Sequence, residues 1–139
     1  MSIREIDLNV DYTKLCLWWD EHKALPVPRH FLPLGFMAEE DGHDIAACFL
    51  YLDVTGHLSM IEYLTTNPAF SFSKKTLVAF KTLIAHVEQI SFRQGCRAII
   101  SMVAPGTSEE RIMGKLGYET STGVSHRMWG RKLTEAPCP

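Results

Sequence analysis

The sequence lacks three features that would point to a membrane or to nucleic acid. No apolar run approaches the roughly 20 residues that a membrane-spanning helix needs. The first residues, SIREIDLNVD, lack the apolar segment of a secretory signal. Basic residues are not in excess, since 14 Lys and Arg stand against 16 Asp and Glu, a net charge of −2, and they are scattered. We therefore expect a soluble, cytoplasmic protein with neither a nucleic-acid nor a membrane partner.

The sequence also lacks a pattern of metal ligands. The four cysteines are far apart and form no CxxC or Cys/His spacing, which argues against structural zinc and favours reduced thiols. The histidines share no ligand spacing, and no GxSxG motif is present. We predict no metal. These statements concern Cys16, Cys48, Cys96 and Cys138, and His30, His43, His57, His86 and His126.

What is present is enough apolar material for one core. A chain of 139 residues, 46% of them hydrophobic, has room for one domain, and no linker or internal repeat divides it. We predict a single domain over residues 1–133. Residues 134–139 read as a frayed tail.

Residues 58–95 form the centre of the predicted fold. LSMIEYLTT has the period-two pattern of an interior strand with bulky groups on both faces. Asn67-Pro68 ends it. A long amphipathic helix follows, with Ser73 as its N-cap and Gly95 as its stop.

The flanking segments complete a mixed α/β pattern. Residues 2–8 suit a short strand, and Asp11 is placed to cap a helix over residues 12–22. Because Trp18 and Trp19 are adjacent, they are not expected both to face the core, so one should line a pocket or lie exposed. Three prolines make residues 24–35 a loop or broken helical turn, before antiparallel strands at 35–39 and 45–54.

After the long helix, RAIISMV is an almost continuous apolar run, which predicts a buried strand parallel to the one before the helix. Ser108 is expected to cap a short helix that ends at Gly117, and residues 125–133 are a last strand.

The order of these elements resembles the GNAT acyltransferase family over nearly the whole chain. Two stretches carry the likeness: IEYLTTNPAF leading into the long helix, and RIMGKLGYE, similar to that family's short helix with its lysine-leucine-glycine-aromatic end. The resemblance implies an α/β (α+β) fold with a mixed central sheet of about six to seven strands, mostly antiparallel, a splayed parallel pair and three to four helices.

The resemblance further implies that acetyl-CoA or another acyl-CoA lies where residues 60–66 and 97–103 splay apart. Free backbone groups of the first strand would pair with the pantetheine amides, and the pyrophosphate would lie over the amino end of the long helix. The implied coenzyme-binding residues are Leu64, Thr65, Thr66, Ser71, Phe72, Ser73, Lys74, Lys75 and Thr76.

Both glycines of the family's pyrophosphate loop are missing, because Lys74 and Thr76 stand in their places. In one interpretation, Lys74 or Lys75 contacts phosphate directly and binding survives in altered form. In the other, the loop has lost coenzyme binding. A third is that both lysines are solvated, although positive charge is unfavourable at a helix start and so hints at a nearby anion.

Acetyl transfer needs a base that keeps the amine neutral, and a carboxylate on the strand before the long helix often serves in the family. Glu62 is the only carboxylate there, so it is our candidate catalytic base. The alternative is a cross-strand ion pair. The family's usual acid, a tyrosine four residues before the glycine, is Met113 here, and Tyr118 matches an aromatic that packs into the core.

We therefore expect a GNAT-like acyltransferase that moves an acyl group directly from acyl-CoA to a small-molecule or protein amine. The alternative is a catalytically inactive GNAT-fold protein that binds a ligand or a protein. The last strand is available to pair between two copies, which would give a homodimer. The acceptor side offers Trp18, Trp19, His22, Arg29, His30 and Phe36, of which Trp18, Trp19, His30 and Phe36 are our candidate substrate-binding residues.

Overall fold

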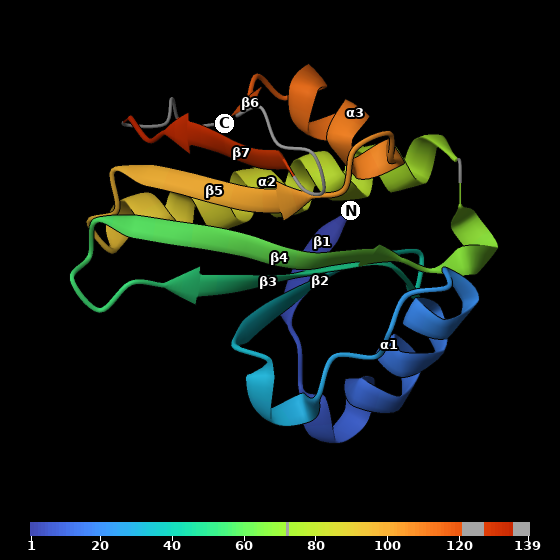
Figure 1. Cartoon of the computed structure of the whole chain (residues 1–139). Coiled ribbons are helices and arrows are strands. Elements are labelled where there is room, and N and C mark those ends of the chain that lie inside the picture. The colour runs from blue at the N-terminus through green and yellow to red at the C-terminus, as the bar shows by residue number, and fades with distance from the viewer. Residues whose placement is uncertain (72, 121–126, 135–139) are drawn as a thin grey trace. The chain divides into compact units, whose positions relative to one another are not determined.

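The structure is a computed structural model that describes residues 1–71, 73–120 and 127–134. These described residues form one mixed, mostly antiparallel sheet of seven strands in the order β1-β2-β3-β4-β5-β7-β6, with three α-helices (Figure 1). The predicted fold class is confirmed. The elements are β1 (Ser2–Glu5), α1 (Leu8–Glu21), β2 (Leu34–Glu40), β3 (His43–Leu52), β4 (Leu58–Thr66), α2 (Lys74–Arg93), β5 (Ala98–Val103), α3 (Ser108–Lys115), β6 (Glu119–Thr120) and β7 (Arg127–Lys132), with short 3-10 turns η1 (Arg29–Phe31) and η2 (Pro68–Phe70).

The contacts divide the chain into two compact units. The first comprises Met1–Phe49 and Tyr63–Leu83, and the second comprises Leu50–Glu62 and Ile84–Pro139. β3, β4 and α2 therefore contribute residues to both. The single domain over residues 1–133 stays a prediction, and residues 135–139 of the predicted tail lie outside the described chain.

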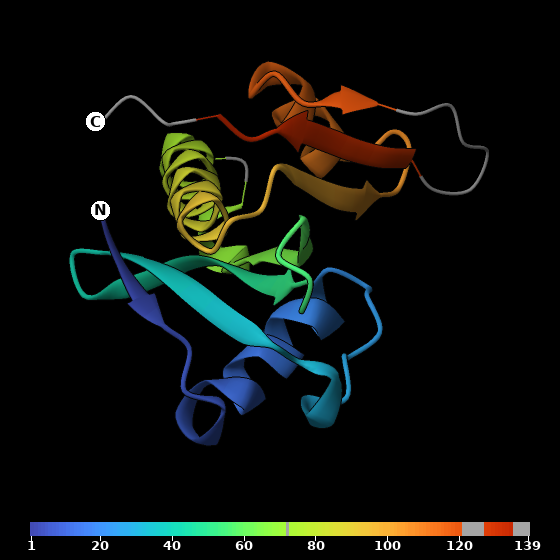
Figure 2. The ribbon, with the colours of Figure 1, turned by 90° about the vertical axis from the view of Figure 1, so that its left-hand side faces the viewer.

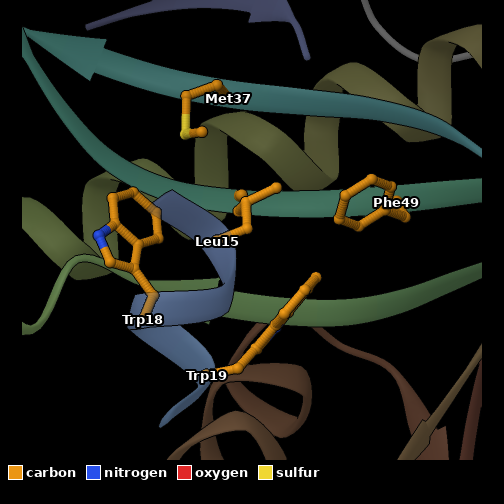
Figure 3. Packing of buried hydrophobic residues seen from close by; sticks show 6 residues of the cluster. Leu15, Trp18, Trp19, Met37 and Phe49 are labelled. Carbon is orange, nitrogen blue, oxygen red and sulfur yellow. The ribbon is translucent and has the colours of Figure 1, made fainter. Parts of the chain in front are cut away.

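The core of the first unit is built on α1. Leu15, Trp18 and Trp19 pack against Met37 of β2 and Phe49 of β3 (Figure 3). Trp18 is 5% exposed and Trp19 is 4% exposed. The expectation that adjacent tryptophans could not both face the core is therefore wrong. Neighbouring residues lie about 100° apart on a helix, and an apolar stripe of that width accommodates both.

The amino end of α1 is fixed by charged groups. Asp7, not the predicted Asp11, is the N-cap, and its side chain accepts the amide of Asn9 at 2.9 Å. Asp11 lies inside the helix with its side chain only 1% exposed. Arg4 of β1 reaches both carboxylate oxygens of Asp11, at 2.7 and 2.9 Å. This hydrogen-bonded pair lowers the pKa of Asp11 and raises that of Arg4.

Two further carboxylates complete the cluster around Arg4. Its guanidinium donates to Glu39 of β2 at 2.9 Å and to Asp44 of β3 at 3.1 Å. Lys14 of α1 pairs with Asp44 as well. Burial alone would raise the pKa of Asp44, yet Lys14 and Arg4 hold it below its ordinary value. The cluster ties α1 to β1, β2 and β3.

In the second unit, β5 lies between β4 and β7. It pairs in parallel with β4, as predicted, and antiparallel with β7 from Ala98↔Lys132 to Val103↔Arg127. Figure 2 shows β5 beside β7. β6 pairs with the other edge of β7. A homodimer formed through this last strand stays a prediction. Thr107, not Ser108, caps α3, through the amide of Glu110 at 3.3 Å.

Candidate functional site

The parallel pairing of β4 with β5 covers only part of each strand. It runs from Leu58↔Ala98 to Ile61↔Ser101, whereas β4 continues to Thr66 and β5 to Val103. The next amide of β5, that of Met102, donates to the side-chain Oε1 of Glu62 at 3.0 Å. A carboxylate thus takes the place of a backbone acceptor at the point where the ladder ends. Pairing along the full length of β4 and β5 would have contradicted the prediction that these two strands splay apart.

In the first unit, the end of β4 departs from a regular strand. Tyr63 has a left-handed φ of 54°, a conformation that is uncommon for a large side chain in a strand. Leu64 is half-buried, and the consecutive residues Thr65 and Thr66 are 3% and 8% exposed. Two adjacent inward residues break the strict alternation that the sequence pattern predicts.

His22 joins the end of α1 to the end of β4. Its Nε2 lies 2.9 Å from the carbonyl oxygen of Thr66 and 3.0 Å from Thr66 Oγ1. Because a carbonyl oxygen can only accept, Nε2 carries the proton and donates it. The sequence offered His22 as an acceptor-side group, but only the fold shows its partner.

The start of α2 is capped by its own side chains. Ser73 Oγ accepts the amide of Thr76 at 3.2 Å, which confirms Ser73 as the N-cap. The hydroxyl of Thr76 donates to the carbonyl oxygen of Phe70 at 2.6 Å, and Thr76 is 8% exposed. The side chain that replaces the second glycine of the family's loop is therefore turned into the loop and hydrogen-bonded there.

Lys74 and Lys75, at the amino end of α2, differ in the contacts that their side chains make. Lys75 pairs with Glu40 at 3.1 Å and Asp41 at 3.3 Å, both at the β2–β3 turn, and these carboxylates raise the pKa of Lys75. Lys74 is exposed, and its side chain makes no hydrogen bond or ion pair with another described residue. Of the two lysines predicted to meet phosphate, Lys74 is the available one.

The residues at the amino end of α2 can hold an anion although the loop lacks the family's two glycines. The first amides of a 20-residue helix point outwards with the positive end of its dipole. The Oγ atom of Ser71 is buried and has no hydrogen-bond partner among the residues described. The Ser71 hydroxyl and the exposed ammonium group of Lys74, three residues further on, are both of a type that binds a phosphate oxygen. Phe72, the remaining loop residue of the prediction, lies outside the described chain.

The predicted acceptor residues do not form one cluster. Phe36 is 2% exposed and packs in the core of the first unit, as Trp19 does. His30 is exposed on η1, with its ring centroid 4.4 Å from that of Phe31. Trp18 also lines a hollow, which agrees with the expectation that one of the tryptophans would line a pocket. Glu21, on the same hollow, had no sequence signal beyond its place at the end of a helix.

The short helix α3 has no tyrosine at the position of the family's usual acid. Met113, at the position of the family's tyrosine, is completely buried. Tyr118 is 4% exposed and donates its hydroxyl to Glu88 of α2 at 2.8 Å. Glu88 also accepts from Arg131 at 3.0 Å, and the Arg131 guanidinium lies 5.3 Å from the Tyr118 ring centroid. These contacts assign Tyr118 to the packing of the second unit.

The described residues contain neither a cluster of metal ligands nor a membrane-spanning helix. No group of three or more His, Cys, Asp or Glu side chains suited to a metal ion occurs in the described part of the chain. The absence of a metal stays a prediction. No helix among these residues is both long and apolar enough to cross a bilayer.

The fold is that of the GNAT acetyltransferases. The chain superposes on N-acetylglutamate synthase from Neisseria gonorrhoeae, solved with coenzyme A and N-acetyl-glutamate, with a TM-score of 0.73 and 16% identity over 96% of this chain and 35% of that one. It spans about a third of that enzyme's length. It also matches aminoglycoside 6'-acetyltransferase type Ii, with a TM-score of 0.71 and 15% identity over 99% of this chain and 100% of that one.

A third similar structure is yncA from Salmonella typhimurium, solved with acetyl-CoA as its cofactor. The TM-score is 0.69, with 14% identity over 100% of this chain and 97% of that one. By sequence alone, neither a protein-family model nor a curated protein matches the chain. Identities this low show the fold, and the chemistry has to be argued from the residues.

Proposed function

We propose that this protein transfers an acetyl or other acyl group from acyl-CoA directly to an amine. The observation that carries the proposal is the α2 start of the GNAT fold, where the helix amides, Lys74 and the unpartnered Ser71 Oγ can hold a phosphate. When bound, acyl-CoA would supply a thioester whose carbonyl carbon a neutral amine attacks, with the thiolate of coenzyme A as the leaving group. Backbone groups of Leu64, Thr65 and Thr66 are proposed to hold the pantetheine.

Glu62 is proposed as the base that removes the proton of the amine. Its Oε1 accepts the Met102 amide, and this contact fixes the orientation of the carboxylate. Acceptor binding is proposed on the α1 side of the first unit, through Trp18 and His30, with Trp19 beside Trp18 in the α1 core cluster. Phe36, the remaining candidate, is buried on β2 outside that cluster.

The proposed coenzyme site is tested by calorimetry with acetyl-CoA. Lys74→Ala should weaken binding about fivefold to tenfold, since one charge-assisted contact to phosphate is lost. Lys81→Ala is the matched control, because Lys81 is exposed further along α2 and makes no hydrogen bond or ion pair with a described residue. Equal effects of the two variants would remove Lys74 from the site. No heat and no thermal shift of the wild type at millimolar acetyl-CoA would refute the proposal.

A second candidate function is supported by the same loop. Its two missing glycines, the commitment of Lys75 to Glu40 and Asp41, and the inward turn of Thr76 would suit a GNAT-fold protein that has given up catalysis. Such a protein would act as a ligand- or protein-binding module. It is distinguished by the calorimetric titration, because it predicts no binding of acetyl-CoA.

A further inference from the structure

A hollow in the first unit is formed by the last turns of α1 and the η2 turn. It has a volume of about 380 Å³ and is lined by Leu17, Trp18, Glu21, Asn67, Pro68 and Ala69. The hydrogen bond from His22 to the carbonyl of Thr66 fixes the end of α1 beside the strand that leads into this turn. The size suits a small organic group.

The lining of this α1–η2 hollow combines apolar residues with two polar ones, Glu21 and Asn67. Leu17 is 59% exposed and does not belong to the core, so its aliphatic side chain is accessible to a ligand. Asn67 is already committed, because its Oδ1 accepts the amide of Ala69 at 3.0 Å and its Nδ2 donates to the carbonyl of Asp44 at 2.9 Å. Glu21 makes no hydrogen bond or ion pair with another described residue. Glu21 is therefore the polar group left to meet a ligand.

Glu21 carries its negative charge at the carboxyl end of α1, where a negative charge is unfavourable. It is the final residue of α1, Asp20 precedes it, and no basic residue occupies the last turn. The carboxyl end of a helix carries the negative end of the dipole, which disfavours carboxylates and favours cations. The hollow thus combines an exposed aliphatic side chain, an indole and a carboxylate that has no ion-pair partner among the described residues. An ammonium group on an alkyl chain matches each of these features.

We propose that the α1–η2 hollow binds an aliphatic ammonium group of the acceptor, with Glu21 as its counter-ion and Leu17 and Trp18 packed against the alkyl chain. The word acceptor rests on the proposed function, but the binding of the ammonium group does not. A group held here as a cation is not the neutral amine that attacks the thioester, so it is a second amino group of the acceptor.

The test is an NMR titration of the full chain with n-butylamine, which is cationic at neutral pH, with n-butanol as the uncharged comparison. The amides of Glu21 and Ala69 should shift with the amine and much less with the alcohol. Glu21→Gln should weaken amine binding about fivefold, the equivalent of ~1 kcal/mol for a partly exposed ion pair. Asp20→Asn is the control: it removes the same charge one residue away, from a side chain that does not line the hollow.

Each outcome decides the proposal. Weakening by Glu21→Gln but not by Asp20→Asn supports it. Equal weakening by both variants would mean a diffuse attraction to the helix end and would overturn it, as would equal binding of amine and alcohol. Because this titration contains no acyl-CoA, it can succeed even if acetyl-CoA fails to bind, so the failure of the acyltransferase proposal and the failure of this site are distinguishable.

Discussion

Removal of the Arg4 side chain is expected to destabilise the protein through Asp11. In Arg4→Ala, the contacts that remain to the buried carboxylate among the described residues are Lys14 at 3.5 Å and the amide of Asp7 at 3.0 Å. Breaking a buried ion pair costs about 3–5 kcal/mol. Because the Arg4 side chain is 32% exposed and Lys14 remains, we take the lower end, about 3 kcal/mol of unfolding free energy. With a urea slope of about 2 kcal/mol/M, the midpoint should fall by about 1.5 M.

The stability difference between wild type and Arg4→Ala is expected to depend on pH. Arg4 holds the pKa of folded Asp11 below its ordinary value of 3.8, so the stabilisation is fully present above that value and is lost as the pH falls through the folded pKa. The difference between wild type and Arg4→Ala should therefore be complete at about pH 7 and shrink below about pH 4.

The assay is urea unfolding followed by circular dichroism at several pH values. Arg111→Ala is the matched control, because Arg111 is exposed on α3 and its side chain makes no hydrogen bond or ion pair with a described residue. It should change the midpoint little. A midpoint loss for Arg4→Ala no larger than for Arg111→Ala, or one of the same size at about pH 3 and about pH 7, would refute the reasoning.

Two further predictions concern the candidate site. Glu62→Gln keeps an oxygen for the Met102 amide but cannot take a proton, so turnover should fall, most strongly at low pH, with little change in thermal stability; an unaltered pH profile would remove Glu62 as the base. Trp19→Ala should lower the unfolding free energy by about 3–5 kcal/mol in urea titrations, because the indole lies in the core cluster. A stable Trp19→Ala variant with only a raised KM would instead assign Trp19 directly to the acceptor.

The sequence predicted most of the element order because hydrophobic periodicity is local information. The stretch from β4 to β5 has the pattern of an interior strand, an amphipathic helix and a buried strand, and the structure places them so. The missing glycines of the loop could also be read directly. The role of Asp11 could not be predicted in this way, because it depends on where α1 begins. The structure shows that Asp7 caps the helix and that Arg4 of β1 binds Asp11.

The site was less predictable because its contacts join residues distant in sequence. The carboxylates that engage Lys75 come from the β2–β3 turn, and the partner of Glu62 comes from β5. Nothing in the spacing of Tyr63 signals a left-handed conformation, since a tyrosine at that point of a pattern favours a regular strand. The register of a sheet and the conformation of one residue depend on the packing around them.

The pairing of Lys75 with the β2–β3 turn has a consequence for what the helix start can attract. Glu40 and Asp41 hold Lys75 at 3.1 and 3.3 Å, and Glu40 also lies 4.0 Å from the amino group of Met1, so these two carboxylates face two cations. The carboxylates of a hairpin far upstream thus hold one of the two lysines at the amino end of α2, and this bears on the affinity of that end for an anion. Neutralising that hairpin would release Lys75 and alter this affinity without touching a single residue of the loop itself.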